Sequence, residues 1–173
     1  MGSFTFVTGG CRSGKSSHAQ SLAESLSPDR RLYVATMQPM DPEMDKRVAD
    51  HKAQRDDSWY TVEEPIDIVK VIEEEQTKAG VILVDCMTLW VTNLFLAEES
   101  EAAIFEKVEA FAESAAALSV PVVTVSNEVG MGIVPDNAMS RAFRDIQGGA
   151  NQRLAAKAQN VIFTVSGIPM KIK

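Results

Sequence analysis

The segment GGCRSGKS, residues 9–16, matches the pattern G-x-x-x-x-G-K-[ST] in full. Glycines let a backbone turn tightly and aim its N–H groups at a bound anion. Lys15 is the residue type that reaches the terminal phosphates of a nucleoside triphosphate, and the Ser16 hydroxyl is an oxygen ligand for Mg²⁺. The residues expected to hold the nucleotide are Gly9, Gly10, Cys11, Arg12, Ser13, Gly14, Lys15 and Ser16.

A carboxylate that complements this loop comes at Asp85, which ends the apolar run VILVD. Mg²⁺ prefers oxygen ligands and usually keeps several waters, so Ser16 and Asp85 are the expected metal residues. The loop and the carboxylate together predict binding of a nucleoside triphosphate with Mg²⁺. They do not by themselves distinguish a kinase from a GTPase switch or a motor.

The elements that must position these residues alternate between short β-rich runs and longer helical ones. Strands are predicted at 4–8, 31–36, 58–62, 81–85 and 122–126, and helices at 15–26, 41–57, 65–78, 88–96, 101–118 and 137–159. The runs 161–165 and 168–172 flank Ser166 and Gly167, a turn pair that predicts a terminal antiparallel hairpin. The pattern indicates one α/β domain over residues 1–173, with a mostly parallel sheet flanked by helices. Function in such sheets collects at the carboxyl ends of the strands.

Composition narrows the function further. The net charge of −7 argues against nucleic-acid and anionic-membrane partners, although a local nest of N–H groups can still hold one phosphate. Two cysteines cannot build a disulfide framework, which favours the reducing cytoplasm. We also expect no signal peptide and no membrane span, because the longest apolar run, residues 87–97, is short and interrupted by polar residues.

The sequence alone leaves the roles of one loop and of the two histidines open. The loop SNEVGMGIVPDN, residues 126–137, follows a predicted strand and carries apolar residues without a helical period. Its composition favours an interface or substrate loop over a plain connector. His51, in DHKAQR, has the surroundings of a solvated histidine on a charged helix, and His18 those of a helix-surface or packed histidine.

Three stretches of the sequence resemble one known family, the bifunctional adenosylcobinamide kinase / adenosylcobinamide-phosphate guanylyltransferases. They are TGGCRSGKSSHA, RVADHKAQRDDSW, and NEVGMGIVP followed by RDIQGGANQ. The resemblance implies a RecA-like phosphate-loop fold, a homotrimer and a corrinoid substrate. It also implies two reactions: ATP or GTP phosphorylates adenosylcobinamide, and GTP then gives GMP, through a histidine, to adenosylcobinamide phosphate.

The same resemblance assigns roles to residues outside the loop. His51 matches the histidine that becomes guanylylated, and Lys52 and Arg55 are placed to offset phosphate charge. Thr36, Met37 and Glu63 match nucleotide contacts. The chain departs from the family where Arg55 is followed by Asp56 and Asp57 instead of proline, which puts negative charge near the phosphates.

Two alternative hypotheses about function remain beside the bifunctional enzyme. One is a small-molecule kinase of the phosphate-loop type without nucleotidyl transfer. The other is a non-catalytic GTP-binding switch, in which His51 has no chemical role.

Overall fold

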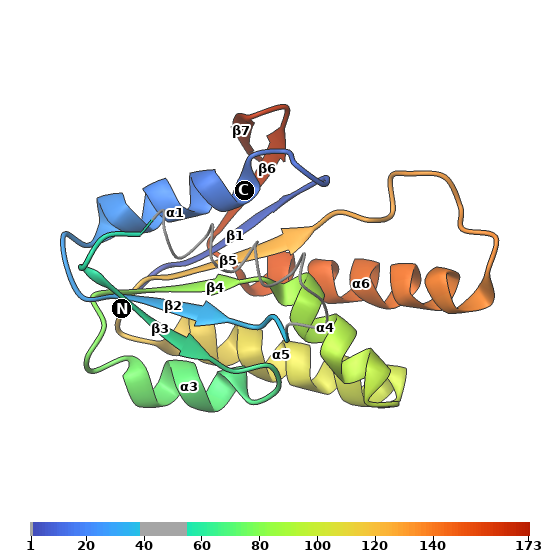
Figure 1. Ribbon diagram of the computed structural model, residues 1–173, viewed down its shortest axis with the longest axis horizontal. Coiled ribbons are helices and arrows are strands. Elements are labelled where there is room, and N and C mark those ends of the chain that lie inside the picture. The colour runs from blue at the N-terminus through green and yellow to red at the C-terminus, as the bar shows by residue number, and fades with distance from the viewer. Residues whose placement is uncertain (1, 39–54) are drawn as a thin grey trace.

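The computed structural model describes residues 2–38 and 55–173 of the chain. Within these residues the strands form one seven-stranded sheet in the order β3-β2-β4-β5-β1-β6-β7 (Figure 1). Neighbouring strands are parallel, except that β6 and β7 pair antiparallel through the terminal hairpin. The strands are β1 (Phe4–Gly9), β2 (Arg31–Ala35), β3 (Trp59–Glu63), β4 (Val81–Asp85), β5 (Val122–Asn127), β6 (Asn160–Val165) and β7 (Ile168–Lys171).

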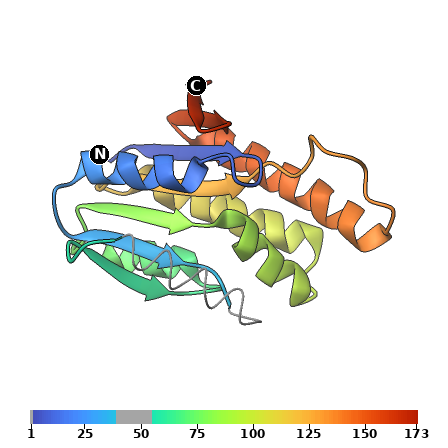
Figure 2. The ribbon, with the colours of Figure 1, turned by 45° about the horizontal axis from the view of Figure 1, so that its top comes forward.

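Helices cover both faces of the sheet, as Figures 1 and 2 show. One face packs against α1, and the other packs against α3, α4, α5 and α6 in a larger hydrophobic core. The described helices are α1 (Lys15–Leu26), α3 (Ile68–Glu75), α4 (Met87–Leu96), α5 (Glu101–Ala117) and α6 (Ala138–Lys157). The expected α/β class, with its mostly parallel sheet and terminal hairpin, is therefore confirmed.

The middle of the sheet is formed by strands that are buried on both faces. All residues of β1 are buried, as are the first four residues of β4 and the first five of β5. A strand covered by helices on both sides needs apolar residues at successive positions, and this is why VILVD reads as a continuous run. The two polar ends of these strands, Asp85 and Asn127, are the positions where the strands leave the core.

The structure differs from the sequence predictions at two helices. The helix expected over 65–78 spans only Ile68–Glu75. It starts late because residues 64–67 form a bend in which Glu64 accepts hydrogen bonds from the N–H groups of Ile66 and Asp67. It ends early because residues 76–78 form a turn closed by the N–H of Lys78 on the Glu75 carbonyl. Most of the helix expected over 41–57 lies outside the described residues. Its described end, residues 55–57, is not helical, and Asp56 there accepts a hydrogen bond from the N–H of Ser58.

The long helix expected near the C-terminus forms as predicted, with Asn137 capping its first turn. Gly148 and Gly149 lie inside this helix and do not interrupt it. A Cβ atom at Gly149 would lie 2.6 Å from the ring of Phe105, so glycine at this position lets α5 and α6 approach closely. None of the helices in residues 2–38 and 55–173 combines the length and apolar character needed to cross a membrane.

Candidate nucleotide site

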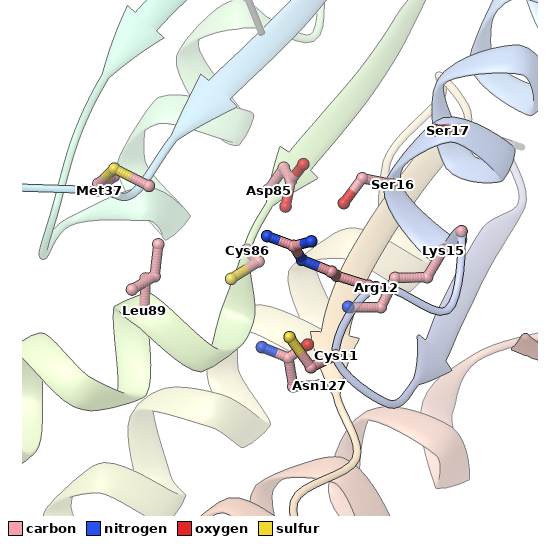
Figure 3. Close-up of a pocket in the computed structure, with 11 residues that line it drawn as sticks. Cys11, Arg12, Lys15, Ser16, Ser17, Met37, Asp85, Cys86, Leu89 and Asn127 are labelled. Carbon is pink, nitrogen blue, oxygen red and sulfur yellow. The ribbon is translucent and has the colours of Figure 1, made fainter. Parts of the chain in front are cut away.

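The carboxyl ends of β1, β4 and β5 meet at one edge of the sheet because these strands are parallel neighbours. A pocket of about 470 Å³ opens at this edge (Figure 3). It is lined by Cys11, Arg12, Gly14, Lys15, Ser16, Ser17, Met37, Asp85, Cys86, Leu89 and Asn127. The expected loop residues and the expected carboxylate therefore come together around one cavity.

The loop between β1 and α1 has the backbone shape that its glycines allow. Gly14 caps α1 with φ of 90°, a left-handed conformation that favours glycine. The N–H of His18 makes the first helical hydrogen bond, 3.0 Å to the Gly14 carbonyl. The N–H groups before it have no partner within the helix, and they carry the positive end of the helix dipole toward the pocket. Such a helix start is an anion-binding site.

Lys15 and Arg12 supply the positive side chains of the pocket. The Lys15 ammonium donates to the Gly10 carbonyl at 3.2 Å, so the side chain folds back over its own loop. Figure 3 shows Arg12 reaching from the loop toward Asp85 and Cys86. Both cations therefore lie where they can stabilise the charge of a bound triphosphate.

Ser16 and Asp85 face each other across the pocket in Figure 3. A hydroxyl and a carboxylate are hard oxygen donors, which suit Mg²⁺ held between the protein, water and substrate phosphates. Within residues 2–38 and 55–173, no three His, Cys, Asp or Glu side chains gather as a metal cluster. Ser16 and Asp85 are therefore a donor set that fits a nucleotide-bound Mg²⁺.

Asp85 is also held from behind by a tyrosine. Tyr33 donates its hydroxyl to Asp85 Oδ2 at 3.1 Å, and the Arg55 guanidinium lies 3.6 Å from the centre of the Tyr33 ring. Burial, with the negative charge of Asp85 as a second cause, raises the pKa of Tyr33 well above its usual value. The phenol therefore stays protonated and acts as a donor to the carboxylate.

Arg55 is thus brought to the neighbourhood of the pocket, although the pocket lining does not include it. Its Nη1 atom is buried and has no hydrogen-bond partner among the described residues. A guanidinium with one buried, unused donor, next to an anion-binding edge, can serve a phosphate oxygen.

The three nucleotide contacts expected outside the phosphate loop, Met37, Thr36 and Glu63, differ in how far they lie from the pocket. Met37 lines the pocket. Thr36 is fully buried and bridges β2 to the residue after β4, accepting from the Cys86 N–H at 2.9 Å and donating to the Cys86 carbonyl at 2.8 Å. Glu63 ends the edge strand β3, two strands away from Asp85, and is exposed. The Thr36 hydroxyl is therefore engaged with the Cys86 backbone, and Glu63 does not line the pocket.

Gly9, Gly10 and Ser13 do not line this pocket. Gly10 and Ser13 line a neighbouring pocket of about 350 Å³, which shares Cys11 and Arg12 with the first. Glu128 and Met131, from the loop over 126–137, complete its wall together with β6. That loop therefore reaches the phosphate loop. His51 and Lys52 lie outside the described residues.

Asn127 is a pocket residue that the motif did not indicate, and a buried polar network fixes its backbone. The Asn127 N–H donates to the Thr88 hydroxyl at 2.7 Å, and Asn151 Nδ2 donates to the Asn127 carbonyl at 3.0 Å. Ser126 and Gln147 join the same network through Asn151. The signal for Asn127 in the sequence is its place at the end of a predicted strand, on the same sheet edge as Asp85.

Tyr33 was also missed, for a physical reason. Tyr33 and Asp85 lie on neighbouring strands, two residues out of register, since Tyr33 pairs with Leu83 and Ala35 pairs with Asp85. Such diagonal neighbours on one face are within reach of a long aromatic side chain, and the small Ala35 leaves the path open. The contact between Tyr33 and Asp85 follows from the strand register, which cannot be read from the sequence alone.

Comparison with known proteins points to one family. Residues 5–172 match the family model described as cobinamide kinase / cobinamide phosphate guanyltransferase. The chain is 40% identical to the bifunctional adenosylcobalamin biosynthesis protein CobP of Pseudomonas aeruginosa, with 96% of this chain and 95% of that protein covered. It is 41% identical to the bifunctional adenosylcobalamin biosynthesis protein CobU of Salmonella typhimurium, over 96% of this chain and 98% of that protein.

The fold has a more distant likeness among solved structures. A KaiC-like protein from Pyrococcus horikoshii superposes with a TM-score of 0.52 at 14% identity, covering 93% of this chain and 70% of that one. At this identity the likeness concerns the fold alone. It agrees with the RecA-like arrangement expected for the phosphate loop.

Proposed function

The chain belongs to the cobinamide kinase / cobinamide phosphate guanyltransferase family, and on this premise we propose how its residues divide the two activities. It is a bifunctional enzyme of adenosylcobalamin biosynthesis that acts on a corrinoid and uses nucleotide. One observation supports the residue assignment above all others: the phosphate loop and Asp85 line one pocket.

In the first reaction, the free hydroxyl of adenosylcobinamide attacks the γ-phosphorus of ATP or GTP. A new O–P bond forms, the bond between the γ-phosphorus and the bridging oxygen breaks, ADP or GDP leaves with that oxygen, and the hydroxyl proton is released to solvent. Lys15, Arg12 and the N–H groups at the start of α1 stabilise the charge of the transferring group. Ser16 and Asp85 would hold Mg²⁺, which when bound neutralises phosphate charge.

In the second reaction, an imidazole nitrogen of His51 attacks the α-phosphorus of GTP and releases pyrophosphate. The phosphate of adenosylcobinamide phosphate then displaces His51, the P–N bond breaks, and adenosylcobinamide-GDP forms. Neutral imidazole is a competent nucleophile near neutral pH, and a covalent intermediate splits one difficult transfer into two easier ones. Lys52 and Arg55 offset the charge of the phosphates, and Met37, Thr36 and Glu63 remain proposed nucleotide contacts.

The two activities are separated by incubation with GTP labelled at the α-phosphorus. Wild type should acquire a covalent label that is acid-labile and alkali-stable, with release of pyrophosphate. His51→Ala should not be labelled but should still phosphorylate adenosylcobinamide. His18→Ala is the matched control, since His18 is the other histidine of the chain, and it should be labelled as wild type. Lys15→Ala should lose about a hundredfold or more of the phosphorylation rate.

Each outcome tests a different part of the proposal. Unlabelled wild type would remove the transferase assignment and leave a monofunctional kinase. GTP binding with neither phosphorylation nor labelling would favour a non-catalytic switch. Near-normal phosphorylation by Lys15→Ala would contradict the role of the loop lysine.

We also propose that the single domain assembles as a homotrimer in the cytoplasm. Support for assembly comes from exposed apolar side chains on the loop over 126–137, where Met131 is 78% exposed and Ile133 97%. A second set, including Ile168 and Met170, lies on the terminal hairpin. Apolar surfaces of this kind are typical of subunit contacts. Cys11 and Cys86 are both free, in keeping with a reducing compartment.

A further inference from the structure

Tyr33 has two contacts that no motif of the sequence indicates. Its hydroxyl donates to Asp85 Oδ2 at 3.1 Å, and its ring carries the Arg55 guanidinium at 3.6 Å. Tyr33 is 7% exposed, and its ring packs edge-on against Trp59 with 6.4 Å between the ring centroids. A buried aromatic that is packed in this way keeps one orientation, so both contacts are fixed together.

The hydrogen bond occupies one oxygen of the carboxylate. With Oδ2 held by the phenol, the other oxygen of Asp85 is left for the pocket, where Figure 3 shows the Ser16 hydroxyl facing the carboxylate. Groups that hold a metal-binding carboxylate from behind set its direction, and their loss typically lowers metal affinity about 10–100-fold.

The contact of the Tyr33 ring with Arg55 places a positive charge near Asp85. Arg55 is the described end of the segment that contains His51, and its stacking on Tyr33 brings the guanidinium beside the group that holds Asp85. Its Nη1 donor is buried and unpartnered among residues 2–38 and 55–173. Through its hydroxyl and its ring, Tyr33 therefore connects Asp85 to Arg55.

We propose that Tyr33 is a positioning residue of the nucleotide site, whose hydroxyl orients Asp85 toward a phosphate-bound Mg²⁺ and whose ring supports Arg55 beside it. This inference rests on the proposed function, because it takes Asp85 as a metal ligand. It adds a residue outside the phosphate loop, and it predicts different effects for the hydroxyl and the ring.

The hydroxyl is tested by Tyr33→Phe, which keeps the ring. The matched control is Tyr60→Phe, since Tyr60 also donates to a carboxylate, Glu75, at 3.2 Å, away from the pocket. The measurement is binding of a fluorescent GTP analogue as a function of Mg²⁺ concentration, with unfolding by denaturant as the check on folding. Tyr33→Phe should raise the half-saturating Mg²⁺ concentration about 10-fold and leave binding in EDTA unchanged. Tyr60→Phe should change neither.

The ring is tested by Tyr33→Leu in the labelling assay with α-labelled GTP at saturating Mg²⁺. It should label more slowly than Tyr33→Phe, because Arg55 loses its support. Equal rates for the two folded variants would overturn the role of the ring, and a Tyr33→Phe that matches Tyr60→Phe in its Mg²⁺ dependence would overturn the role of the hydroxyl. If wild type itself binds the analogue without any dependence on Mg²⁺, the metal role of Asp85 fails and this proposal fails with it.

Discussion

Asp85 is the residue on which the polar contacts of the pocket converge. Tyr33 donates to it, and Ser16 and Arg12 point toward it in Figure 3. Its charge also acts on Cys86: burial first, and the neighbouring carboxylate second, raise the pKa of the Cys86 thiol to about 12. The two cysteines of the chain therefore differ strongly in reactivity, since Cys11 is exposed at the edge of the pocket.

This difference predicts a simple probe of occupancy. At pH 8 an aromatic disulfide reagent should modify one thiol of the folded protein quickly, and Cys11→Ser should abolish that phase, because the thiolate is the reactive form and Cys86 stays protonated. Saturating GTP should slow the reaction of Cys11, which lines the nucleotide pocket. Cys86 should react only in denaturant. Rapid labelling of folded Cys11→Ser would contradict the burial of Cys86.

At the scale of elements, the end of β5 depends on helices α4 and α6. Thr88 of α4 and Asn151 of α6 hold the backbone of Asn127 from two sides, and Ser126 connects them at 3.2 Å and 2.7 Å. Buried polar groups that satisfy each other in this way fix one arrangement of the elements that carry them. The pocket wall at Asn127 is therefore set by helix packing as well as by the sheet.

Removing Asn151 should affect both stability and binding. Asn151→Ala leaves the Asn127 carbonyl without this donor and should lower the free energy of unfolding by about 1–3 kcal/mol, measured with denaturant. It should also weaken GTP binding, because Asn127 lines the pocket. The control is Asn137→Ala, which removes the cap of α6 and should cost about 1 kcal/mol without changing GTP affinity. Equal GTP affinities for the two variants would contradict the role of the network.

Particular residues show how far the sequence predicts this site. The loop, Lys15, Ser16 and Asp85 follow from local spacing, since a strand, a glycine-rich turn and a helix position them without long-range information. Tyr33 and Asn127 could not be found in this way, because their contacts depend on strand register and on helices distant in sequence. The helix expected over 65–78 began too early in the prediction because the Glu64 side chain pairs with N–H groups of the bend before Ile68.

At the scale of the whole molecule, strand–helix alternation was enough to predict the class of fold, but not the order of the strands. That order puts β1 between β5 and β6, so the phosphate loop lies beside both the 126–137 loop and the terminal hairpin. In Figure 1 the β5–α6 connection extends from one end of the sheet, whereas the hairpin extends from its side. The exposed apolar residues thus lie on two elements, the 126–137 loop and the terminal hairpin, which both border the phosphate loop.

Assembly should therefore depend on the tip of the 126–137 loop. Wild type should sediment as a trimer, and Ile133→Asp should shift it toward monomer, because a charge would be buried against the partner. Sedimentation equilibrium over a range of concentrations measures this. Glu106→Asp, a change on the exposed surface of α5, is the control and should remain trimeric. A wild type that stays monomeric throughout the range would exclude the trimer.

The turn of the terminal hairpin is tied to the phosphate loop: the N–H of Gly167 donates to the Ser13 carbonyl at 2.8 Å, and a Cβ atom on Gly14 would lie 3.1 Å from Gly167. The loop near the beginning of the sequence is thus braced by residues near its end. During synthesis, the motif leaves the ribosome early but lacks this support until residue 167 has emerged. A nascent chain therefore carries the complete phosphate-loop motif long before the contact that braces the loop can form.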